Sequence, residues 1–241
     1  MKKLVGILIC GCSLLYSHHA MEYIEMESYS TALKGEKIFH LHYDYFVEEK
    51  DSPDFDHWEF TPGISYGITN YIMFDIHTHF SKFNKGFVKN NEEISPFIEA
   101  LAASIQFRIP KFTFLDFGFV LGYEVPFKRA KKYIDGKEVF EGKIILSKDF
   151  WEHSNICFNF NFIKDGDEFL KEWAFGIKNP ISSDPHGIAA GIEILGDYEG
   201  ALFFLPGIYF RVENSILKTG IGFGNKKSTN LRANLTLMYR F

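Results

Sequence analysis

The chain has 241 residues and a formal net charge of -5, so its overall charge does not favour binding to the anionic backbone of nucleic acid. Aromatic residues make up 17% of the sequence, with 27 phenylalanines, a composition that favours strands and membrane interfaces over helices. No run of about 18 apolar residues follows the amino terminus, which excludes a transmembrane helix. We expect one all-β domain.

The first 20 residues are typical of a secretory signal peptide, because two lysines precede an apolar run over 4–15. We expect cleavage after Ala20, with cleavage after Ser17 or lipidation at Cys12 as alternatives. Either cleavage removes two of the three cysteines and leaves Cys157, so no intramolecular disulfide is expected.

A short lead segment, 21–35, precedes residues 36–241, where stretches of alternating apolar and polar side chains are separated by turn residues. Each stretch reaches the length of about 9–11 residues that a tilted strand needs to cross a membrane. The twelve predicted strands cover 36–48, 57–69, 71–82, 96–109, 112–126, 138–148, 153–164, 168–179, 186–196, 200–212, 214–224 and 230–241. The even count predicts a transmembrane, antiparallel, up-and-down β-barrel of about 12 strands.

The predicted connections are alternately short and long, as in outer-membrane barrels with periplasmic turns and external loops. The predicted short links are Asn70, 110–111, 149–152 and 213, and the longer ones are 49–56, 83–95, 127–137 and 225–229. The link 180–185 departs from this rule because it is longer than a periplasmic turn.

The phase of each strand predicts which face meets lipid. In the last strand the apolar face carries Leu231, Ala233, Leu235, Leu237, Tyr239 and Phe241. The other face carries Arg232, Asn234, Thr236, Met238 and Arg240. A soluble lipocalin-like barrel or a secreted β-sandwich would show the same period, but twelve strands with a charged second face favour an apolar exterior.

The first three strands bring histidines and carboxylates to the predicted lumen, with two His-x-His pairs whose members each share a face. This set comprises His40, His42, Asp44, His57, Glu59, Asp75, His77 and His79. Imidazole pairs beside carboxylates can bind zinc or copper, so His40, His42, His77 and His79 are the alternative metal ligands. We expect instead that they line a wet lumen, with no metal and no cofactor.

Farther round the barrel, charges of both signs are predicted to face the lumen. The cations are Arg108, Lys143, Lys178, Arg211, Arg232 and Arg240, and the anions are Asp116, Glu124, Glu141, Glu172 and Glu193. We expect them to form ion-pair ladders or a field that orients solutes. Large inward residues such as Phe203, Leu205 and Tyr209 would narrow the lumen, and the lead segment would add a small constriction.

The external loop 127–132 is basic, and Lys226 and Lys227 lie in another external loop; both are candidates to contact lipopolysaccharide, with a simply solvated loop as the alternative. An outer-membrane lipid-modifying enzyme is the rival class. No Gly-x-Ser-x-Gly, His-Glu-x-x-His or phosphate-binding glycine loop is found, so we predict that the chain is not an enzyme.

Four stretches resemble uncharacterised bacterial outer-membrane proteins allied with transporter-like barrels of the MetA phenol-degradation type. They are Leu33–Glu36, Pro62–Thr69, Glu141–Leu146 and the glycine-rich C-terminal hairpin. The resemblance implies a transport barrel without catalytic residues. The terminal Phe241, with Tyr239, resembles the signal that other outer-membrane barrels present to the barrel-assembly machinery. We therefore expect a monomeric pore for small solutes in the cell outer membrane, with a structural or adhesive barrel of closed lumen as the alternative.

Overall fold

The computed structural model describes residues 23–241 apart from 29, 49–52, 89–94, 110–114, 134–135, 151–153, 183, 185–186 and 226–228. The predicted signal peptide, Lys226 and Lys227 lie outside the described residues. Among the described residues, no helix combines the length and apolar character needed to cross a bilayer.

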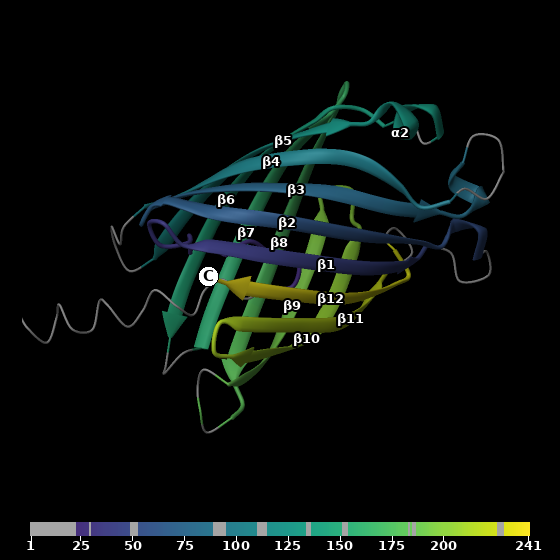
Figure 1. The fold of residues 1–241 in the computed structure, drawn as a ribbon. Helices are drawn as coiled ribbons and strands as arrows, with labels where there is room; N and C mark the ends of the chain where they lie inside the picture. The colour runs from purple at the N-terminus through teal and green to yellow at the C-terminus, as the bar shows by residue number, and fades with distance from the viewer. Residues whose placement is uncertain are drawn as a thin grey trace, which may run out of the picture.

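Twelve antiparallel strands close into one barrel, which confirms the predicted fold (Figure 1). The strands are β1 (Lys37–Val47), β2 (His57–Thr69), β3 (Ile72–Phe83), β4 (Phe97–Ile109), β5 (Asp116–Pro126), β6 (Val139–Phe150), β7 (Ser154–Asp165), β8 (Glu168–Pro180), β9 (Ile188–Asp197), β10 (Leu202–Val212), β11 (Ser215–Gly224) and β12 (Leu231–Arg240). In the described parts of the connections lie three short helices, η2 (Pro53–Phe55), η3 (Lys85–Phe87) and α2 (Lys128–Tyr133).

Most strand ends agree with the prediction within two residues. The predicted fifth strand starts at 112, where 112–114 lie outside the described residues, and β5 starts at Asp116. Strand β10 begins two residues after its predicted start at 200. The Asp197 carboxylate accepts the backbone amides of Glu199 and Ala201, both at 2.8 Å, and forms a turn there. Gly200 within this turn has φ of +95°, a conformation that a strand does not use. The strand therefore begins at Leu202.

The first and last strands close the barrel, as the sequence predicted for a terminal strand of twelve. Their register places Leu41 opposite Leu237, and the backbones of Lys37 and Phe241 exchange hydrogen bonds of 3.1 and 3.0 Å. Closure satisfies the backbone groups of the edge strands, which hydrocarbon cannot hydrogen-bond.

Apolar side chains face outward along β12. Leu235 and Tyr239 are each 46% exposed, whereas Asn234 and Thr236 are buried inside. Most exposed side chains of the other strands are also aliphatic or aromatic. An apolar exterior around a polar interior is the arrangement of a membrane-spanning barrel, not of a lipocalin.

The two ends of the barrel differ. The C-terminus lies at one end, together with the tight turn between β10 and β11, where Glu213 adopts φ of 51°. Helix α2 lies at the opposite end (Figure 1). Short turns are periplasmic in outer-membrane barrels, so we expect α2 at the external end.

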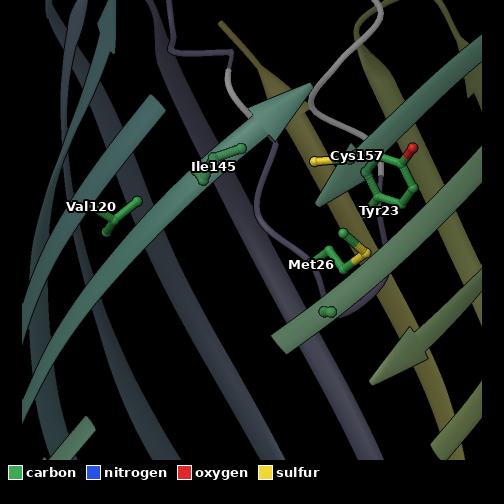
Figure 2. Packing of buried hydrophobic residues seen from close by; sticks show 6 residues of the cluster. Tyr23, Met26, Val120, Ile145 and Cys157 are labelled. Carbon is green, nitrogen blue, oxygen red and sulfur yellow. The ribbon is translucent and has the colours of Figure 1, made fainter. Parts of the chain in front are cut away.

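Residues 23–36, apart from 29, precede β1, and we call them the inner segment; most of them lie inside the barrel, whereas 33–35 are exposed. Tyr23, Ile24 and Met26 are buried, with exposed fractions of 1%, 6% and 6%. Figure 2 shows Tyr23 and Met26 among side chains of the barrel wall, including the free thiol of Cys157 on β7.

Candidate pore lumen and inner segment

A cavity of about 480 Å³ lies in the lumen, between the inner segment and a wall formed by β1–β7, β11 and β12. Seven carboxylates line it: Glu25, Glu27, Asp44, Glu59, Asp75, Glu124 and Glu141. Two permanent cations, Lys218 and Arg232, line it as well. The described lining is therefore predominantly acidic.

Asp75 on β3 joins histidines from two strands. Its carboxylate accepts hydrogen bonds from His40 Nε2 at 2.7 Å and from His77 Nδ1 at 2.6 Å. The Ser65 hydroxyl donates to the same carboxylate at 2.7 Å. The contact of His40 with Asp75 could not be predicted, because β2 lies between their strands.

Gly63 on β2 makes this contact across a strand feasible. It is paired in register with both His40 and His77. A Cβ atom at Gly63 would lie 2.3 Å from His40 Cε1 and 2.6 Å from His77 Cβ, well inside van der Waals contact. The His40 ring therefore occupies the space that a side chain at this position would need.

The other predicted histidines have separate partners. His79 Nε2 lies 3.3 Å from the Glu124 carboxylate, and His42 Nδ1 lies 3.0 Å from the Thr236 hydroxyl. The His57 ring stacks between Phe46 and Phe83. No three His, Cys, Asp or Glu side chains among the described residues are arranged to hold a metal ion.

Glu193 on β9 holds the inner segment. Its carboxylate accepts three successive backbone amides, those of Ile24, Glu25 and Met26, at 2.5, 2.9 and 3.0 Å. The Tyr209 hydroxyl donates to it as well, at 3.0 Å. Glu193 is fully buried, and four donors replace the water that its charge would otherwise need.

Further contacts join the inner segment to strands around the wall. Lys218 Nζ donates to the Tyr23 carbonyl at 2.5 Å, and the Tyr23 hydroxyl donates to the Asn155 side chain at 2.8 Å. Gln106 on β4 donates to the Ser28 carbonyl at 2.6 Å. The segment thus crosses the lumen from β7 and β11 to β4.

Inward-facing glycines leave room for the segment. A Cβ atom at Gly176 would lie 2.4 Å from the Tyr23 ring, and one at Gly207 would lie 2.3 Å from the Ile24 side chain. Ile24 also packs against the predicted inward residues Phe203, Leu205 and Tyr209. Together these contacts form a socket for the start of the segment.

Several predicted lumen cations pair with acids of the inner segment. Arg232 contacts Glu25 at 2.9 Å and also Asp44 at 3.2 Å. Lys143 lies 3.3 Å from Glu141 and 3.9 Å from Glu27. Arg240 lies 3.6 Å from Glu36. Arg232 thus joins the segment to Asp44 on β1, and Lys143 pairs with Glu141 on its own strand; ion-pair ladders around the barrel stay a prediction.

The remaining predicted residues lie on the wall away from this cavity. Lys178 on β8 is buried, with its ammonium 5.9 Å from the Tyr23 ring centre. Asp116 is buried on β5, and Glu172 is paired in register with Asn161. The last two, Arg108 and Arg211, lie on β4 and β10.

Burial, and in smaller part the neighbouring carboxylates of Asp44 and Glu193, raise the pKa of Glu25 to about 7. The cations Arg232 and Lys218 act in the opposite direction. The inner segment therefore carries a carboxyl group that titrates near neutral pH.

Sequence reasoning missed Lys218, Gln106, Ser65 and Gly63. The first three face inward in the phase of their strands, so the alternation that located the other lumen residues would also have located them. The importance of Gly63 depends on the register of three strands, which the sequence does not give.

No family model matches the chain, and no curated protein matches it. Among solved structures, it is similar to an outer membrane channel from Pseudomonas putida F1, with a TM-score of 0.62 and 12% identity over 91% of this chain and 100% of that chain. It is also similar to a KdgM porin in complex with disordered oligogalacturonate, with a TM-score of 0.58 and 7% identity over 86% of this chain and 99% of that one. The resemblance to the MetA type stays a prediction. The chain has the fold of an outer-membrane β-barrel channel.

Proposed function

We propose that this chain is an outer-membrane channel for small solutes, that it favours cations, and that its inner segment limits the passage. The acidic cavity in the lumen of a closed barrel is the observation that carries the proposal. Seven carboxylates face two permanent cations there. A pore lined by one predominant sign of charge concentrates ions of the opposite sign.

The two lumen cations offset only part of the negative charge of the seven carboxylates. Arg232 is paired with Glu25 and Asp44, and the Lys218 ammonium is bound to the Tyr23 carbonyl. Glu59 and Glu124 line the wall on β2 and β5, and Glu141 on β6 is paired with Lys143. A passing cation would meet these carboxylates in a narrow, polar space.

A reversal potential measured across a KCl gradient tests the proposed preference. We expect the sign of a cation-selective pore, and a smaller value for the double variant E124Q/E141Q. The matched control is E172Q, an acidic position on β8 outside the cavity lining. An anion-selective wild type, or equal shifts in the double variant and the control, would contradict the proposed charge effect.

A surface barrel with a closed lumen is the second candidate, and the bound inner segment favours it. Such a barrel would stay silent in a bilayer even after the segment is loosened. The absence of enzymatic activity and the monomeric state also stay predictions. We further propose that Tyr239 and Phe241, whose rings stack 6.1 Å apart at the end of the chain, contact the assembly machinery.

A further inference from the structure

The outer wall over β1–β4 contains an apolar groove of about 980 Å³. Tyr43, Phe60, Phe80 and Ile98 occupy successive register positions on these four strands and form a row across them. Trp58 lies beside the row, with its ring 6.2 Å from that of Tyr43. The row runs across the strands, so the groove presents a continuous apolar surface to lipid.

Basic side chains from α2 line one end of this groove. Ala130 is fully buried against Phe83, Val88 and Phe97, and this contact anchors the short helix to the barrel. Lys128 and Arg129 are exposed and line the groove, and the Arg129 guanidinium lies 5.5 Å from the Phe97 ring centre. Two cations therefore lie beside the aromatic row.

The combination fits an amphiphile with apolar chains and an anionic headgroup. The row would contact the chains, and the two cations would bind phosphate through charge-assisted hydrogen bonds. The α2 end is the external end of the barrel, so the ligand belongs to the outer leaflet. A protein partner that adds a strand is disfavoured, because the barrel has no open edge.

We propose that this groove is a binding site for a phosphorylated glycolipid of the outer leaflet, of the lipid A class. The site lies on the exterior, separate from the lumen, and needs only the proposed outer-membrane location. It would position the barrel in the outer leaflet through one lipid bound between β1–β4 and α2.

The refolded full chain in detergent provides the test, with bound lipid measured by native mass spectrometry. Bis-phosphorylated lipid A is compared with the same lipid lacking both phosphates and with phosphatidylglycerol. The variant K128A/R129A removes the two groove cations. Its matched control, K131A/K132A, removes the same charge from positions of α2 that do not line the groove.

We expect the wild type and K131A/K132A to bind bis-phosphorylated lipid A alike. The contacts of the two cations with phosphate are lost in K128A/R129A and with the lipid A that lacks phosphates. Either loss should weaken lipid A binding roughly thirtyfold. Equal binding of both lipid A forms, equal binding of phosphatidylglycerol, or equal loss in both double variants would overturn the proposal. Heat-dependent electrophoretic mobility checks that each variant is folded. Conductance is measured on the same samples, so a failure of the lipid-binding proposal can be distinguished from a failure of the proposed channel function.

Discussion

The carboxylate of Glu193, buried in the barrel wall, accepts the backbone amide of Ile24 at 2.5 Å. The amides of the next two residues bind the same carboxylate. One wall residue thus holds three consecutive peptide groups of a segment that lies inside the lumen. The donors are backbone amides, which most substitutions in the segment do not remove. The acceptor, Glu193, is therefore the residue to change when these bonds are tested.

Replacing Glu193 with Gln should loosen the inner segment and make channel openings larger or more frequent. The substitution keeps the size of the side chain but removes the charge and one acceptor oxygen. Hydrogen bonds to a charged group contribute about 2 kcal/mol each, so the loss of even one should lower the equilibrium constant for docking roughly thirtyfold. Single-channel recording measures this, with E172Q as the control. Unchanged openings in E193Q would show that the segment does not limit conduction.

The Gly176→Val substitution should displace the segment without changing any charge. The new side chain would occupy the space of the Tyr23 ring, and overpacking of this kind costs about 1–3 kcal/mol. Gly142→Val is the control, because a Cβ atom there meets nothing within 4 Å. We expect greater access of a thiol reagent to Cys157, which packs beside Tyr23, in G176V alone. Equal labelling of the two variants would contradict the packing described.

Docking of the inner segment should weaken as the pH rises from about 4.5 to about 7. The raised pKa of Glu25 means that the docked state favours the protonated carboxyl, so its stabilising contribution is complete below the ordinary value of 4.5. That contribution is lost as the pH approaches 7. Openings should therefore become more frequent over this range, and E25Q should remove the change. An E25Q channel with the wild-type pH profile would assign the effect to another group.

Gly63→Val should destabilise the barrel by about 1–3 kcal/mol, because the new side chain expels His40 and breaks its hydrogen bond with Asp75. The temperature at which the folded band disappears in electrophoresis measures the effect. The Gly142→Val barrel should keep the wild-type temperature. If the Gly63→Val and Gly142→Val barrels unfold at the same temperature, Gly63 is not the residue that accommodates His40.

The fold was predictable because apolar and polar side chains alternate every two residues along a strand. Twelve alternating stretches of membrane-spanning length are compatible with few folds other than a closed barrel. Alternation alone also placed Glu193 on the inner face. Its contact with Ile24 was not predictable, because the path of the inner segment depends on side chains from several strands at once. Nor was the pairing of His40 with Asp75, which depends on the register at Gly63.

Single-channel recording of the wild-type barrel in a planar bilayer tests the central claim most directly. We predict stepwise currents whose reversal potential in a KCl gradient has the sign of a cation-selective pore. A barrel that inserts and is folded, yet passes no current either as wild type or as E193Q, would contradict the channel and favour a closed surface barrel.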